Sequence, residues 1–104
     1  MAQTITIANG GTASTAAEVR GKHSYGFIII PTMTSTVITW EVSDDGTNFS
    51  ALYDALGVQQ ISAPAFTSQR AFQIPTGCLA ANYFRISVAS QGAARTLYVC
   101  LSNG

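Results

Sequence analysis

Charged side chains are scarce in this sequence. Its 104 residues include 5 Lys or Arg and 5 Asp or Glu, which makes 10% charged, against about one quarter in an ordinary domain. The basic residues are spread along the chain and the net charge is +0, so no basic patch for a phosphate backbone is present and nucleic-acid binding is not expected. Small neutral residues replace the charge. Because such groups dehydrate cheaply and a neutral chain tends to associate, we expect extensive burial against partners and homo-oligomerisation.

Long apolar runs are also lacking. The densest patch, residues 27–30, falls far short of the roughly 18 residues that span a bilayer, so no membrane segment is predicted. Residues 1–4 have neither the basic start nor the apolar stretch of a secretory signal, and we expect use in the cytoplasm or release by lysis. No linker, charge run or repeat divides the chain, which predicts one domain over residues 1–104.

Histidine and cysteine are too few to build a metal site or a disulfide framework. His23 is the only histidine, with no second histidine for zinc and no G-x-S-x-G serine, and we interpret it as a solvated loop residue. Cys78 and Cys100 lie in no metal-binding spacing. We interpret both as small buried hydrophobic residues, although one bridge between them stays open.

The carboxylates suggest turns rather than chemistry. Glu41 and Asp54 are the conceivable glycosidase pair, yet one lies on the outward side of a strand pattern and the other at a turn. Asp44, Asp45 and Asn48 offer oxygens that suit calcium, but turn formation alone explains these residue types. We therefore predict no enzyme, no cofactor and no metal.

What the sequence does contain is a series of short β-branched and aromatic runs separated by turn residues, typical of an all-β domain. We predict a single antiparallel β-sandwich of about eight strands. Residues 12–22 are expected to be mostly loop, in which residues 16–20 form either one helical turn or a loop leading into an edge strand. The expected strands are residues 4–7, 25–30, 37–43, 49–53, 58–62, 70–74, 83–88 and 96–101.

Alternation with a period of two predicts which residues form the core. Trp40 should be its central residue, with Ser43 on the outward side of the same strand, and Asp45-Gly46 should make the following hairpin turn. Residues 25–30 are apolar on both sides, so we expect one side to face the core and the other a partner subunit. The predicted inward residues are Ile38, Trp40, Val42, Phe84, Ile86, Val88, Leu97, Val99 and Leu101.

Aromatic residues are the remaining candidates for a binding site. They serve either as anchors of a protein interface or as a stacking platform for sugars. Phe66, in a loop after Pro64, suits insertion into a partner. The candidate interface residues are Tyr25, Phe27, Tyr53, Phe66 and Tyr83, with Tyr98 as a further exposed aromatic.

Two stretches of sequence carry a resemblance. ITWEVSDDGTNF, residues 38–49, resembles a strand-turn-strand element of many β-sandwich modules. The wider pattern GFIIIPTMTSTVITWEVSDDGTNFSALYDALG, then RAFQIP and NYFRISV, resembles small virion proteins of tailed bacteriophages, including capsid decoration or cement proteins with jelly-roll-like folds. It covers about residues 25–101.

The resemblance implies a non-enzymatic structural protein of the virion, made in the host cytoplasm. It would bind the assembled capsid protein as a dimer or trimer and brace the shell. Residues 1–23 would then be an N-terminal strand or arm used in oligomer or partner contacts. Two alternatives stay open: a carbohydrate-binding or adhesion module, with Tyr53, Phe66 and Tyr83 as the sugar platform, and a phage tail or baseplate component.

Overall fold

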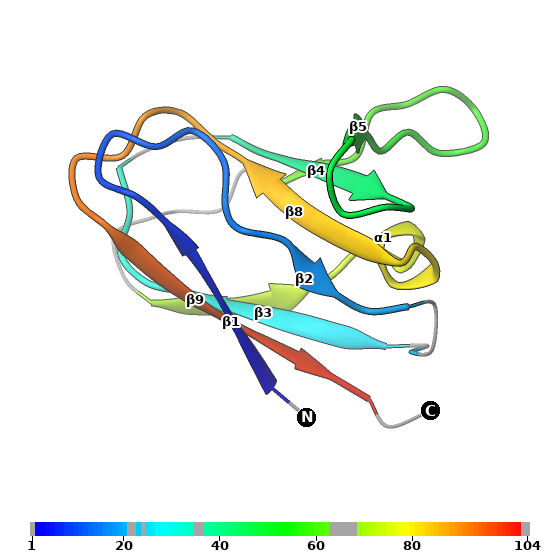
Figure 1. Ribbon diagram of the computed structural model, residues 1–104, viewed down its shortest axis with the longest axis horizontal. Coiled ribbons are helices and arrows are strands. Elements are labelled where there is room, and N and C mark those ends of the chain that lie inside the picture. The colour runs from blue at the N-terminus through cyan, green and yellow to red at the C-terminus, as the bar shows by residue number, and fades with distance from the viewer. Residues whose placement is uncertain (1, 21–22, 24, 35–36, 63–68, 103–104) are drawn as a thin grey trace.

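The structure is a computed structural model that describes residues 2–20, 23, 25–34, 37–62 and 69–102 (Figure 1). Within these residues the chain forms two antiparallel sheets around one core. Sheet A has the order β1 (Ala2–Ile7), β9 (Arg95–Leu101), β3 (Gly26–Ile30), β7 (Arg70–Gln73). Sheet B has the order β2 (Ala17–Glu18), β8 (Tyr83–Ser87), β4 (Ile38–Ser43), β5 (Ser50–Ala51), and β6 (Ile61–Ser62) also pairs with β4. The predicted single antiparallel β-sandwich is confirmed.

The strand pairings are nested. β1 pairs with β9, β2 with β8, β3 with β7, and β4 with both β5 and β6. A long hairpin that is rolled up on itself produces this order, which is the topology of a jelly roll. β5 and β6 occupy one edge of β4 in succession, so the nine strands among the described residues fill eight positions.

Trp40 lies at the centre of the core, as predicted. Its side chain is fully buried, and its ring centroid is 6.0 Å from that of Phe84 on the neighbouring β8. Val42 is partly buried against the same cluster. The other residues that were predicted to face inward are buried: Ile38, Phe84, Ile86, Val88, Leu97, Val99 and Leu101.

The β4–β5 hairpin turns at Asp45 and Gly46, as expected, and Gly46 has a positive φ of 79° that favours glycine. The outward placement of Ser43 was wrong, because its side chain is buried. Ser43 Oγ accepts the backbone N–H groups of Asp45 and Gly46 and donates to Asp45 Oδ1 at 2.9 Å. The hydroxyl therefore belongs to the turn.

Two short elements complete the sandwich. The described residues between 12 and 22 are mostly loop, as expected, and they contain the edge strand β2, which pairs Ala17 with Phe84 in sheet B. A short helix, α1 (Thr76–Ala80), was not expected, and it buries Cys78 and Leu79. Both elements are too short for a sequence period and form where the packed core needs apolar side chains.

Gln91 joins the connections at one end of the sandwich. Its buried side-chain oxygen accepts the N–H of Thr34, and its side-chain amide donates to the carbonyl of Ala89 at 2.9 Å. Its backbone exchanges hydrogen bonds with Gly10 and Gly11. One residue thus links the β1–β2, β3–β4 and β8–β9 connections, at the left of Figure 1.

The N-terminal segment lies within the sandwich as far as the structure describes it, because β1 and β2 are edge strands of the two sheets. His23, expected in solvent, is half-buried and its Nδ1 contacts the Ser102 carbonyl. The two cysteines are unpaired, and the prediction that both are buried holds for Cys78 but not for the half-buried Cys100. In the described parts of the chain, no helix has the length and apolar character needed to cross a membrane.

Candidate functional site

The outer face of sheet B carries charged side chains that form an ion pair with each other. Arg85 Nε lies 2.6 Å from Glu41 Oε1, across neighbouring strands. The guanidinium carbon of Arg85 is also 4.3 Å from the centre of the Phe49 ring. Both contacts fix the position of the guanidinium on the sheet. Glu41, once a candidate catalytic carboxylate, is therefore one half of an ion pair.

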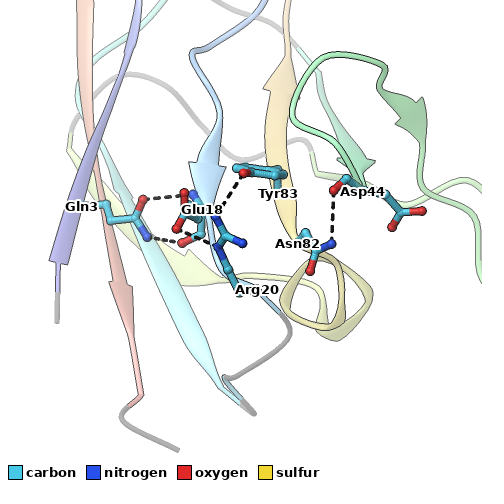
Figure 2. Close-up of polar contacts among 6 residues, drawn as sticks. All are labelled: Gln3, Glu18, Arg20, Asp44, Asn82 and Tyr83. Atoms are coloured by element: carbon cyan, nitrogen blue, oxygen red, sulfur yellow. Dashed lines mark hydrogen bonds and ion pairs between the residues drawn. The ribbon is translucent and has the colours of Figure 1, made fainter.

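A polar seam, formed by Gln3, Glu18, Arg20, Asn82 and Tyr83, closes one edge of the sandwich (Figure 2). The side-chain amide of Gln3 on β1 donates to the backbone carbonyl of Glu18 on β2 at 2.6 Å and accepts its N–H at 3.1 Å. These two bonds connect sheet A to sheet B. Arg20 Nε donates to Glu18 Oε1 at 2.9 Å, and this bond and the charge of Arg20 lower the pKa of Glu18.

Arg20 has a positive φ of 56°, which strains a side chain with a Cβ by about 1–2 kcal/mol. The carbonyl of Asn82 accepts the N–H groups of Val19 and Arg20 and holds this conformation. The amide of Asn82 donates to the Asp44 carbonyl at 3.1 Å (Figure 2). The polar groups of the seam are bound to one another, so the seam is best explained as a closure of the fold.

The Asp45 carboxylate is likewise used by its own turn. It accepts the N–H groups of Thr47 and Asn48 at 2.8 Å and the Asn48 side-chain amide at 2.9 Å. These donors hold the pKa of Asp45 well below its ordinary value. Asp44, Asp45 and Asn48 line a recess of about 320 Å³, but no three acidic, histidine or cysteine side chains within the described ranges are grouped to hold a metal ion.

The outer face of sheet A is different in character. Because Ile28 and Val99 pair across β3 and β9 and are both buried, their neighbours in each strand point outward. Among the described residues, no outward position of this sheet is charged; Arg70 and Arg95 pair with the buried residues Ile30 and Ile7 at the strand ends. We call the outward set the uncharged face: Thr4, Thr6, Tyr25, Phe27, Ile29, Ala71, Gln73, Thr96, Tyr98 and Cys100.

Apolar side chains lie in the middle of the uncharged face. Ile29 pairs with Tyr98 and Phe27 pairs with Cys100 across the two central strands. Tyr98 and Tyr25 are about half exposed, while Phe27 and Ile29 are partly covered by their neighbours. Threonine, alanine and glutamine surround them. An aromatic centre without charges is the composition found at the centre of protein interfaces.

The structure brings together only some of the candidate interface residues. Tyr25 and Phe27 share the uncharged face, whereas Tyr53 lies beyond β5 and Tyr83 lies in the seam on β8. The sheet order places β4 between β8 and β5, so Tyr53 and Tyr83 lie on either side of β4. Phe66 lies outside the described residues. Ile29 was not named among the candidate interface residues, but it lies on the outward side of residues 25–30, which was expected to face a partner.

A projecting hairpin interrupts the edge strand of sheet B. We call residues 53–60, between β5 and β6, the finger; Figure 1 shows it leaving the sandwich beyond β5. The backbone carbonyl of Trp40 accepts the N–H of Leu52, and the backbone N–H of Trp40 donates to the carbonyl of Gln60. The chain therefore returns to the edge of β4 after the finger. Sequence reasoning missed Leu56 and Val58, which the finger leaves exposed. The finger adds apolar surface without adding to the core.

No protein-family model matches this chain, and comparisons with curated proteins and with solved structures find no match.

Proposed function

We propose that this chain is a non-enzymatic structural protein of a phage particle, a decoration or cement protein that docks on the assembled capsid and stabilises it. The observation that carries the proposal is the uncharged face of sheet A. A partner that covers this face removes apolar side chains from water without desolvating an ion. The jelly-roll strand order occurs in viral capsid domains and also in lectins. The strand order therefore does not favour a virion protein over a carbohydrate-binding module, and the proposal depends on the composition of the uncharged face.

The stabilising mechanism is linkage. A protein that binds the assembled shell, and not its separated subunits, shifts the equilibrium toward the shell. Many copies on one particle add their effects. The binding face needs only modest affinity in each copy.

The test is cosedimentation of the purified protein with empty shells of the homologous phage, together with the melting temperature of those shells. We expect saturable binding and a rise in shell melting temperature. Tyr98→Lys places a charge in the centre of the uncharged face and should weaken binding at least about tenfold, since a buried unpaired charge is strongly unfavourable. Thr47→Lys, at the exposed β4–β5 turn, is the matched control and should bind like the unaltered chain.

Cys100 supplies a readout that needs no substitution. It lies half-buried on the uncharged face, beside Phe27, so bound shells should slow its reaction with a thiol reagent. The proposal fails if no homologous particle is bound, or if Tyr98→Lys and Thr47→Lys bind equally well. Binding to tails but not heads would favour the baseplate alternative, and saturable binding on a glycan array would favour the carbohydrate alternative.

A further inference from the structure

The tip of the finger exposes apolar surface that the monomer does not use. Leu56 is 89% exposed, the most exposed large hydrophobic side chain described. Tyr53 and Val58 within the finger, and Ile61 directly after it, are each more than half exposed. Most of the exposed large hydrophobic residues that the structure describes therefore lie in one short segment. Clustered exposed apolar residues mark an interaction site more often than single ones do.

The finger is braced, so its tip is presented in one conformation. Asp54 N–H donates to the Val58 carbonyl, and the Asp54 carbonyl accepts the N–H of Gly57 at 3.0 Å. Gly57 has a positive φ of 81°, which completes the common three-residue hairpin loop with a bulge. Asp54 Oδ1 also accepts the N–H groups of Leu56 and Val58 at 2.8 and 3.0 Å. Binding through this loop loses little conformational entropy.

A recess lies at the base of the same finger. It has a volume of about 420 Å³ and runs between the finger and the start of α1. Leu52, Pro75 and Gly77 give it apolar walls, and Gly77 leaves room because a Cβ there would lie 3.0 Å from Leu52 Cδ1. The complete lining is Leu52, Tyr53, Asp54, Gln60, Pro75, Thr76 and Gly77. A leucine side chain is smaller than this volume.

The tip and the recess are separated along the finger. Leu56 lies in the turn, is almost fully exposed, and is not one of the residues that line the recess. Leu56 therefore does not fill its own recess. A second copy placed antiparallel would set each tip over the base of the other finger. This contact is isologous, so it closes as a dimer.

We propose that two copies of this chain dimerise by exchanging fingers, with Leu56 of each copy seated in the recess of the other. Among the described residues of the finger and the recess, Asp54 carries the only charge, and its Oδ1 is occupied by its own loop. The dimer leaves the uncharged face of each copy free. The proposal of a dimer does not depend on capsid binding. If the capsid is bound, the dimer would provide two linked contacts and a higher effective concentration.

Sedimentation velocity over about 1 μM to about 1 mM tests the dimer, a range suited to a contact below about 1,200 Å². The unaltered chain should pass from monomer to dimer within it. Leu56→Asp should remain monomeric throughout, whereas Tyr98→Asp, which alters a comparably apolar side chain on sheet A, should dimerise normally. A monomeric unaltered chain, or unchanged dimerisation by Leu56→Asp, overturns the proposal. Either result leaves the shell-binding test untouched.

Cross-linking tests the antiparallel arrangement. The double variant Leu56→Cys with Thr76→Cys should form a disulfide-linked dimer under mild oxidation, and a reductant should reverse it. Leu56→Cys alone should form no more dimer than the unaltered chain, which carries Cys78 and Cys100 as background. Equal cross-linking of the single and double variants would mean that the tips meet each other. That result, or absence of a linked dimer in the double variant, contradicts finger exchange.

Discussion

At the scale of single residues, Gln91 shows how one buried residue links three connections through its side chain and its backbone. Its side chain is 1% exposed, and it is hydrogen-bonded to Thr34 and Ala89 through both its oxygen and its nitrogen. Arg95 Nε donates to the same oxygen at 3.3 Å. Truncation to alanine removes these hydrogen bonds and empties a buried site.

We therefore expect Gln91→Ala to lower the free energy of unfolding by roughly 2–3 kcal/mol, since each of the lost hydrogen bonds contributes about 1 kcal/mol. Urea unfolding at neutral pH measures this value. Gln73→Ala, on the exposed side of β7, is the control and should change the value by less than about 0.5 kcal/mol. Similar effects of the two substitutions would show that the Gln91 bonds are not structural.

Asp45 makes the stability of the hairpin turn depend on pH. Its pKa is lowered in the folded chain by hydrogen bonds from Asn48, Thr47 and Ser43. A carboxylate with a lowered folded pKa stabilises the fold above its unfolded pKa of about 3.9, and this contribution is lost as pH falls through the folded pKa.

Asp45→Asn should therefore lower stability by the same amount at pH 7 and pH 5, and the difference from the unaltered chain should shrink below about pH 4. Thermal melting at each pH provides the measurement. Asp44→Asn, one position earlier and outside these bonds, should show a much smaller difference at every pH. A deficit for Asp45→Asn that grows on acidification contradicts the explanation.

At the scale of elements, the finger is an insertion into an otherwise continuous edge strand. β5 pairs with Glu41 and Val42, and β6 then pairs with Ile38 and Thr39 in the same direction along β4. Leu52, directly before the finger, and Gln60, its last residue, are joined by a backbone hydrogen bond of 2.8 Å. None of the residues between them belongs to the buried core.

Replacement of residues 53–59 by a single glycine should leave the fold and the melting temperature nearly unchanged, because no core residue is removed and a shorter loop closes at lower entropic cost. Circular dichroism and thermal melting test this expectation. Trp40→Ala, which should cost about 3–5 kcal/mol, shows that the assay detects a damaged core. Loss of the folded state in the shortened chain would mean that the finger is structural.

At the scale of the whole molecule, the sandwich has two unlike faces. Sheet B bears the Arg85–Glu41 pair and the seam, while the described outward positions of sheet A carry no charge. Among the described residues, the two outer faces therefore differ in charge: sheet B carries charged side chains and sheet A carries none at its outward positions. Association through that side has little electrostatic component.

Shell binding through the uncharged face should accordingly change by less than about twofold between 0.05 and 0.5 M sodium chloride, a range over which the screening length shortens from about 14 to about 4 Å. Cosedimentation titrations at the two salt concentrations measure the affinity. A large loss of affinity at high salt would identify charged groups, such as those of sheet B, as the contact surface.

Much of the core was predictable because strand alternation is local. Trp40, Phe84 and Leu97 are buried as their positions in alternating runs predict. Ser43 broke the pattern because its hydroxyl is used by the following turn. An edge strand near β2 was one of two open alternatives, because two residues have too little periodicity to decide between them. The candidate site was less predictable, since exposure of an aromatic depends on what lies across the sheet.

The sequence by itself determined the fold class, the hairpin at Asp45 and Gly46, and the shortage of charge, because alternation, turn chemistry and composition are local properties. Only the tertiary structure decided where that shortage falls. β1, β3 and β9 come from the two ends and the first third of the chain, and their pairing assembles Thr4, Ile29 and Tyr98 into one row. The tertiary structure also brought the start of α1 beside the base of the finger, which forms the recess. Both surfaces depend on contacts between distant segments, which no local pattern records.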